Sequence, residues 1–128
     1  MSGDGAVHLD AIGQIAISVS DFALSREFYK DTLGMKHLFD AGPMAFFQCG
    51  AVRFMVGAGN EKTVTPGGTI LYFKVDDLAA AHAALVEKNV FFFSDPHLVA
   101  KMPDHDLWMA FFKDPDGYTI GLMSEVKP

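Results

Sequence analysis

The tetrapeptide Met44-Ala45-Phe46-Phe47 is repeated as Met109-Ala110-Phe111-Phe112 within a chain of 128 residues. A second pair of similar segments keeps the same order, with Gln14-Ile15-Ala16-Ile17-Ser18-Val19-Ser20-Asp21 before the first tetrapeptide and Ile70-Leu71-Tyr72-Phe73-Lys74-Val75-Asp76-Asp77 before the second. Similar segments that recur in one order indicate a duplicated supersecondary unit. The sequence therefore predicts two copies of one structural motif.

The size of the chain fits a single domain built from both copies. Half of the residues are apolar, which is enough for a sizeable core. One copy alone, at roughly 60 residues, would bury only ~60% of its unfolded surface, so we expect the copies to fold against each other. We expect a flexible leader at residues 1–10 and a single domain over 11–128, with module 1 at about 11–58 and module 2 at about 69–124.

Charge and cysteine content narrow the classes of partner. The formal net charge is −6 and the 10 lysines and arginines are scattered, which argues against a nucleic-acid partner. The chain has no run of 18 or more apolar residues, so we expect no membrane span. Residues 1–10 lack the basic and apolar regions of a signal peptide. A single cysteine, Cys49, allows no internal disulfide, and we expect a cytoplasmic protein. The expected partners are a small organic molecule and a second copy of the chain.

The first copy begins with a strand, because apolar residues alternate with small or polar residues over residues 14–20. Ser20-Asp21 supplies a side-chain oxygen to cap a helix that runs to Leu33, and Gly34 follows where a left-handed residue would end it. Short apolar runs then predict three strands, at 35–40, 44–48 and 52–57.

The second copy repeats this order. A strand at 69–75 precedes a helix that Asp76-Asp77 caps, and Asn89 takes the position that Gly34 holds in the first copy. Three strands follow at 90–94, 107–112 and 118–123, and Asp114-Pro115-Asp116-Gly117 is a turn between the last two. The remaining segments are a linker at 59–68 and an inserted loop at 95–106. Each copy is therefore predicted to be a βαβββ unit.

The predicted fold class is α+β, with two βαβββ modules whose four-stranded sheets are paired around a cleft. When the helices cover the apolar side of each sheet, Gln14 and Ser18 face the cleft from the first strand. The same alternation turns Ile70, Tyr72 and Lys74 toward it from the fifth strand. We expect the concave faces of the two sheets to turn toward each other and to enclose a ligand.

These segments resemble the vicinal oxygen chelate superfamily, which includes glyoxalase, the bleomycin-resistance proteins and the extradiol dioxygenases. The resemblance implies a glyoxalase-like fold and a homodimer, with the modules paired either within one chain or across the dimer. It does not imply one activity, because the superfamily contains lyases, epimerases, dioxygenases and proteins that only bind. The segments that carry it are Gln14-Ile15-Ala16-Ile17-Ser18-Val19-Ser20-Asp21, Phe28-Tyr29-Lys30-Asp31-Thr32-Leu33-Gly34-Met35, Phe73-Lys74-Val75-Asp76-Asp77-Leu78 and Phe112-Lys113-Asp114-Pro115-Asp116-Gly117-Tyr118-Thr119-Ile120.

Metal enzymes of this superfamily place one ligand on each of four strands, and the resemblance locates those positions here. The first-strand ligand falls on Gln14, the fifth-strand histidine on Ile70 and the last-strand glutamate on Gly121. The equivalent in the first copy is Phe54 or Met55, depending on how the hairpin is aligned. A site of this kind needs three or four oxygen or nitrogen donors, and these positions supply one. We therefore expect no cofactor and no metal at the family position.

Two residues are candidate catalytic groups. Tyr72 faces the predicted cleft, where its hydroxyl would donate to a carbonyl compound; the alternative is a core aromatic with a satisfied hydroxyl. His105, between Asp104 and Asp106, is a candidate general base; the alternative is a solvated loop histidine. Together with His97, these three residues are also an alternative metal-binding set away from the family position.

The candidate ligand-binding residues lie on predicted strands. Gln14 would anchor a ligand, or be an amide that is hydrogen-bonded inside a narrow cavity. Arg53 would bind a carboxylate, or protect an exposed strand edge. Trp108 would line an aromatic pocket, or belong to the core. Ser18 and Thr119 complete the set.

Two functions follow from these residues. The first is a metal-independent lyase or isomerase acting at a carbonyl compound, with Tyr72 and His105 as its catalytic groups. The second is non-catalytic binding or sequestration of a small molecule, as in the bleomycin-resistance proteins, and the missing metal ligands favour it. The same absence argues against a third function, a metal-dependent glyoxalase-type lyase or dioxygenase.

Overall fold

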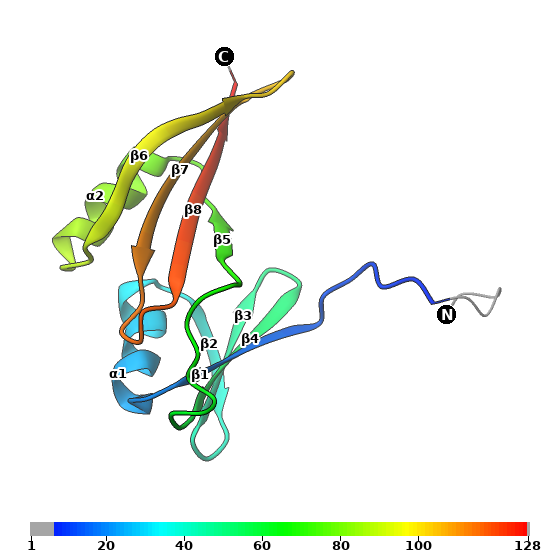
Figure 1. Ribbon diagram of the computed structural model, residues 1–128, viewed down its shortest axis with the longest axis vertical. Helices are drawn as coiled ribbons and strands as arrows, with labels where there is room; N and C mark the ends of the chain where they lie inside the picture. Colours follow the sequence, from blue (N-terminus) through cyan, green and yellow to red (C-terminus); the bar gives the residue numbers. More distant parts are fainter. Residues whose placement is uncertain (1–6, 128) are drawn as a thin grey trace.

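The computed structural model describes residues 7–127 and has an α+β fold with two four-stranded mixed sheets (Figure 1). In the first module the elements are β1 (Gln14–Val19), α1 (Phe22–Glu27), the π-helical turn η1 (Phe28–Thr32), β2 (Lys36–Asp40), β3 (Met44–Cys49) and β4 (Val52–Ala58). In the second module they are β5 (Leu71–Lys74), α2 (Leu78–Glu87), β6 (Phe92–Lys101), β7 (Asp106–Lys113) and β8 (Thr119–Val126).

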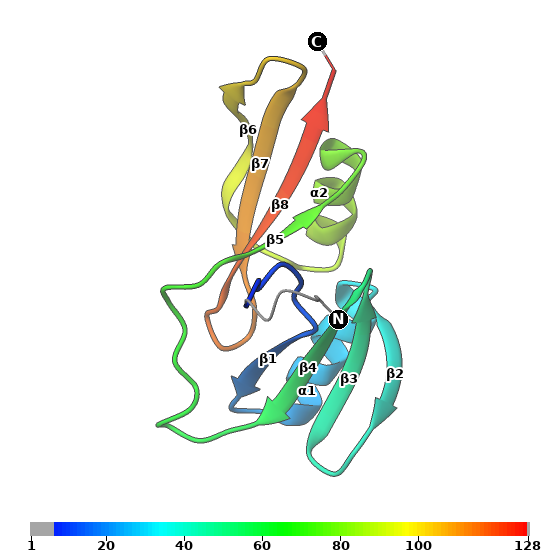
Figure 2. The ribbon, with the colours of Figure 1, turned by 90° about the vertical axis from the view of Figure 1, so that its right-hand side faces the viewer.

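Each module forms its own sheet with an equivalent strand order, β1-β4-β3-β2 in the first and β5-β8-β7-β6 in the second. The β1–β4 and β5–β8 pairs are parallel and the remaining pairs are antiparallel. Both helices lie to the left of the strands in Figure 1, and Figure 2 shows the two sheets one above the other. The predicted fold of two βαβββ modules is confirmed.

The sequence also predicted a leader at residues 1–10 and no membrane span. Of the predicted leader, residues 1–6 lie outside the described part of the chain, and residues 7–10 form neither helix nor strand. Within residues 7–127 no helix has the length and apolar character needed to cross a membrane.

The predicted helix boundaries are confirmed in both modules. The Asp21 carboxylate accepts the backbone N–H of Leu24, and the Asp77 carboxylate accepts that of Ala80, so each aspartate caps its helix. Gly34 and Asn89 follow the two helices with φ of +71° and +66°, the left-handed conformation that ends a helix. The π-helical turn η1 was not predicted, because its spacing of apolar residues does not differ visibly from that of an α-helix.

The predicted loop at 95–106 is wrong, because β6 continues through Lys101. β6 is the outer strand of its sheet, and an edge strand tolerates Pro96, whose missing N–H is not needed by a further neighbour. Shifts of register at Ser94, His97 and Leu98 absorb the irregularity. The connection to β7 is therefore short, and β6 and β7 form a long hairpin.

The repeated tetrapeptide has the same role in both sheets. Its second phenylalanine, Phe47 or Phe112, is fully buried beneath the helices, as is the alanine before it. Its first phenylalanine, Phe46 or Phe111, is only partly buried on the other face of the strand. Because successive side chains of a strand alternate between faces, one motif supplies both the core and the surface opposite to the helices.

The turn between β7 and β8 joins the two modules. Tyr29 on η1 donates its hydroxyl to the Asp114 carboxylate at 2.7 Å, and both groups are buried. The other oxygen of Asp114 accepts the backbone N–H groups of Asp116 and Tyr118 at 2.9 Å. Asp116 in turn accepts the backbone N–H of Ser20 at the end of β1. The predicted Asp-Pro-Asp-Gly turn is therefore both a turn and the contact between modules.

This joint predicts a dependence of stability on alkaline pH. Burial, and then the charge of Asp114, raise the pKa of Tyr29 far above its ordinary value of 10. Above pH 10 the unfolded chain therefore loses the phenol proton while the folded chain keeps it. From this group the free energy of unfolding should fall as pH rises, by up to about 1.4 kcal/mol per pH unit.

Tyr29→Phe should remove that alkaline slope in urea denaturation between pH 8 and pH 11. At neutral pH it should also lower the free energy of unfolding by about 1–3 kcal/mol, because the buried Asp114 carboxylate loses a donor. Tyr72→Phe, which removes a half-exposed phenol on the other face, is the control and should keep the slope. An equal slope in wild type and Tyr29→Phe would refute this account.

Candidate functional site

The face of each sheet that the helices do not cover is called here the open face. On the first sheet it carries a connected set of polar and aromatic side chains. Arg53 Nε donates to Gln14 Oε1 at 2.9 Å, and the Arg53 guanidinium lies 5.5 Å from the centre of the Phe46 ring. Phe39 stacks on Phe46 with ring centres 4.7 Å apart. Gln14 and Arg53, both predicted to bind a ligand, are therefore brought together.

The open face of the second sheet is mainly aromatic. Tyr72 meets Phe111 edge to face at 5.8 Å between ring centres, and Phe93 stacks on Phe111 at 6.2 Å. Lys113 Nζ lies 5.7 Å from the centre of the Phe93 ring. The Tyr72 ring is half exposed, so it is not the satisfied core aromatic of the alternative interpretation.

A group of charged side chains lies at the far end of this second open face. Lys74 Nζ pairs with Glu125 Oε1 at 2.9 Å, which lowers the pKa of Glu125 and raises that of Lys74. His105 Nδ1 lies 2.7 Å from Asp104 Oδ1, and this hydrogen bond lowers the pKa of Asp104. The other ring nitrogen, Nε2, lies 3.8 Å from Glu125 Oε2. His105 is thus oriented by two carboxylates, at a distance from Tyr72 along the sheet.

Both open faces carry exposed side chains, and the sequence left open whether the modules pair within one chain or across a dimer. Both helices lie on one side of the molecule in Figure 1, so both open faces turn away from that side. Large apolar side chains are exposed on them, including Phe39 at 48%, Tyr72 at 45% and Phe93 at 50%. Pairing of modules across a dimer is the arrangement left open by the sequence, and it would cover these faces.

The strand register identifies the four positions that carry metal ligands in the resembled enzymes. Tyr72 pairs with Gly121 in the second sheet, and Ala16 at the equivalent point pairs with Met55 in the first. Phe54 is buried beneath the helix, so the equivalent of Gly121 is Met55. The four positions are therefore Gln14, Met55, Ile70 and Gly121.

These residues do not fit a hard divalent ion. Gln14 supplies an amide, Met55 a thioether and Ile70 an alkyl chain, and Gly121 has no side chain. A site for such an ion needs convergent oxygen and nitrogen donors. A Cβ at Gly121 would lie 2.7 Å from Tyr72 Cδ1 and 3.0 Å from Phe111 Cε1, so aromatic rings fill the space of the last-strand ligand. Within residues 7–127 no group of three His, Cys, Asp or Glu residues is placed to bind a metal. The alternative set around His105 and His97 is therefore not assembled.

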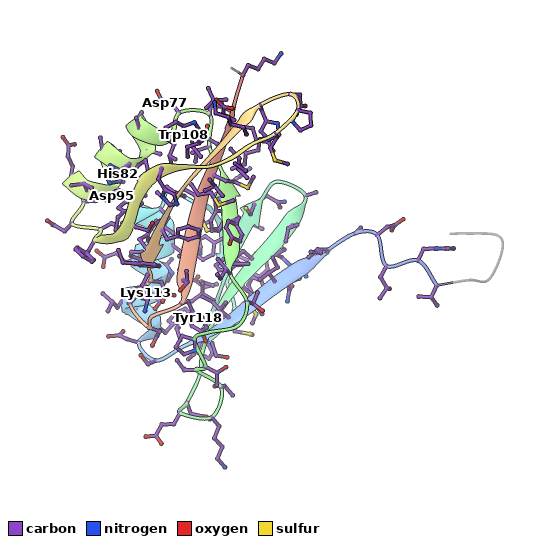
Figure 3. All side chains as sticks on the ribbon, turned by 45° about the horizontal axis from the view of Figure 1, so that its top comes forward. Asp77, His82, Asp95, Trp108, Lys113 and Tyr118 are labelled. Atoms are coloured by element: carbon purple, nitrogen blue, oxygen red, sulfur yellow. The ribbon has the colours of Figure 1, made fainter. Side chains whose placement is uncertain are left out.

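Three further candidates lie away from the aromatic part of the open faces. Trp108 lies on the opposite face of β7, packs against the core and lines a cavity beside the start of α2, close to Asp77 (Figure 3). The backbone oxygen of Ser18 accepts a hydrogen bond from the Tyr118 hydroxyl, where the turn between β7 and β8 meets the first module. Thr119 and Ser18 line a cavity of about 340 Å³ beneath the linker. Of the two alternatives that the sequence left for Trp108, the structure supports the core, because Trp108 has the parity of the buried Phe112.

Sequence reasoning missed Phe39 and Lys113, which also lie on the open faces. The signal for Lys113 was present in the repeat. Phe111 lies on the open face and Phe112 beneath the helices. Because side chains of a strand alternate between faces, Lys113 after Phe112 lies on the open face again. Phe39 and Phe93 lie next to shifts of register in β2 and β6, which strict alternation does not reveal.

Comparison with known proteins gives one family and several similar structures. The family model described as the Glyoxalase/Bleomycin resistance protein/Dioxygenase superfamily matches residues 11–122. The protein YraH of Bacillus subtilis (strain 168), which is uncharacterized, is 32% identical over 120 residues, covering 80% of this chain and 89% of YraH.

Two solved structures show the same fold at low identity. TnmS3, an antibiotic binding protein from Streptomyces sp. CB03234, superposes with a TM-score of 0.74 at 24% identity, over 94% of this chain and 99% of TnmS3. Lactoylglutathione lyase from Agrobacterium tumefaciens superposes with a TM-score of 0.72 at 16% identity, over 89% of this chain and 92% of the lyase. One architecture therefore carries both a binding protein and an enzyme.

The contact of Tyr72 with Gly121 predicts a strong coupling between these positions. Gly121→Ala would place a Cβ against the Tyr72 ring and should lower the free energy of unfolding by about 1–2 kcal/mol, because the ring must move. In Tyr72→Ala the nearest obstruction is absent and only Phe111 remains close, so the second substitution should cost less there. A double-mutant cycle by urea denaturation measures the difference. Additive effects would show that the ring does not lie over the glycine.

Proposed function

The chain belongs to the glyoxalase/bleomycin resistance protein/dioxygenase superfamily, and on that premise we propose that it binds a small organic molecule without a metal and without transforming it. The observation that carries this proposal is the composition of the open faces. They present exposed aromatic rings beside a set of polar and charged side chains, and stacked rings of this kind are typical of a site that recognises shape.

The proposed site lies between two copies of the chain. The first open face of one copy would oppose the second open face of the other, because each is an exposed apolar sheet surface. Exposed apolar patches of this kind are typical of interaction sites. Such a cleft would contain Gln14 and Arg53 on one wall and Tyr72, Phe93 and Phe111 on the other.

The residues at the family metal positions support binding rather than metal chemistry. The amide of Gln14 already accepts a hydrogen bond from Arg53, and Met55 offers a soft sulfur that a hard ion does not prefer. The space at Gly121 is filled by Tyr72. TnmS3 is an antibiotic binding protein with this fold, and it provides a precedent for binding as a function of the architecture.

A second function, acid–base lyase or isomerase chemistry at a carbonyl compound, is favoured by one observation. His105 is held by Asp104 on the same sheet face as Tyr72, as a general base would be held by an orienting carboxylate. Glu125 beside it is paired with Lys74, which stabilises its anionic form. This arrangement supports a base but supplies no acid in contact with it.

The proposed dimer predicts that charge on the open faces prevents association. Light scattering of the wild-type chain should give twice the mass of one chain at micromolar concentration. Phe39→Glu and Phe93→Glu should each give a monomer, because a carboxylate would be buried unpaired in the interface. Val86→Glu, at a site on α2 with 48% exposure, is the matched control and should stay dimeric. A monomeric wild type would contradict the shared cleft.

Binding without turnover predicts a specific pattern among variants. A thermal-shift screen of aromatic metabolites and drugs should yield ligands, since ligand at 100 times its Kd stabilises the folded state by about 2.7 kcal/mol. Phe111→Ala should weaken each ligand, while EDTA and His105→Ala should leave its affinity unchanged. Product analysis should recover the ligand intact. Consumption of a ligand that stops in His105→Ala would instead establish the enzyme, and loss of binding in EDTA would establish a metal.

A further inference from the structure

We propose that the ligand of this site is a planar aromatic anion, an inference that rests on the proposed function and names its ligand class. The reason is the placement of charge. The chain has a formal net charge of −6, yet its two open faces carry an excess of cations. Arg53 and Lys113 lie beside aromatic rings, whereas Lys74 is paired with Glu125.

Arg53 and Lys113 belong to equivalent cross-strand pairs of the two sheets, on different strands of the pair. Lys113 directly follows the second Met-Ala-Phe-Phe and pairs with Thr119 of β8, while Gln48 directly follows the first and pairs with Arg53 of β4. The two cations are therefore in the same row across equivalent sheets. Lys36, which pairs with Gln48 on β2, extends this row in the first sheet.

None of these three cations has a carboxylate partner among residues 7–127. Arg53 donates to the neutral amide of Gln14 and lies over Phe46, and Lys113 lies over Phe93. The ion pairs of the described residues engage other cations, including Arg26 with Asp40 and Lys74 with Glu125. Arg53 in particular keeps its two terminal NH₂ groups for a planar, two-oxygen acceptor.

The next row on each open face consists of aromatic rings. In the first sheet Phe46 and Phe39 are stacked, and in the second Phe93 and Phe111 are stacked with planes 28° apart. Phe46 and Phe111 lie two residues along their strands from the cation row, which makes them its neighbours on the same face. A ligand that stacks on these rings would thus place a substituent next to Arg53 on one wall or Lys113 on the other.

A planar aromatic ring bearing a carboxylate matches both rows at once. The ring would take the place of solvent on the phenylalanine faces, and the carboxylate would complete the hydrogen bonding of the guanidinium. A cationic ligand would meet like charges on both walls. A neutral ligand of the same shape would leave the cations without an acceptor.

The test uses three probes of equal shape: naphthalene-2-carboxylate, naphthalene-2-carboxamide and 2-naphthylmethylammonium. Isothermal titration of the full chain should show the carboxylate binding at least about 10-fold more tightly than the carboxamide, a ratio that corresponds to one charge-assisted interaction. The ammonium probe should bind more weakly than both. Arg53→Gln and Lys113→Gln should each remove most of the preference for the carboxylate, because they should weaken the carboxylate much more than the carboxamide.

Lys62→Gln in the linker makes the same change of net charge away from the open faces, and it should keep the preference. If the carboxamide or the ammonium binds as tightly as the carboxylate, and Phe111→Ala weakens all three, the anion preference is overturned while the small-molecule site stands. If Phe111→Ala weakens none of them, the proposed site itself is overturned. Failure of the carboxylate to bind at millimolar concentration would also overturn the inference.

Discussion

The buried carboxylate of Asp114 is the interaction on which the arrangement of the two modules depends. A buried charge is costly unless hydrogen bonds replace its hydration. Here the replacement comes from both modules, because Tyr29 donates from η1 while Asp116 and Tyr118 donate from the turn. The bond therefore holds the end of the first helix against the second sheet. It places both helices on one side of the molecule and leaves both open faces on the other.

Duplication then gives the molecule two equivalent surfaces with different chemistry. Each Met-Ala-Phe-Phe fully buries one phenylalanine and leaves the other partly buried on the opposite face, so both modules have a core and an aromatic open face. Around that shared pattern the residues diverge. One sheet carries Arg53 bonded to Gln14, and the other carries Tyr72 lying over Gly121. Gly121 has no side chain at the position that the resemblance gives to a metal ligand, and the rings of Tyr72 and Phe111 pack into that space.

Much of the candidate site follows from alternation along strands, and shifts of register limit what alternation can show. Gln14 and Tyr72 were placed on the face opposite to the helices because β1 and β5 are regular in the paired segments. Phe39 was missed because β2 carries a shift of register next to it, and a shift of one residue exchanges the faces of a strand. For Trp108 the sequence left a pocket and the core open, and the structure packs it against the core, with the parity of the buried Phe112.

The sequence by itself determined the two βαβββ modules, the caps at Asp21 and Asp77 and the poverty of metal donors, because these depend on local spacing and on residue type. Only the tertiary structure decided which cations lack a carboxylate partner, that Tyr72 covers Gly121, and that the open faces do not meet within one chain. These features depend on distances between segments that are far apart in sequence. Such distances are set by the packing of one module on the other, which no local pattern of residues encodes.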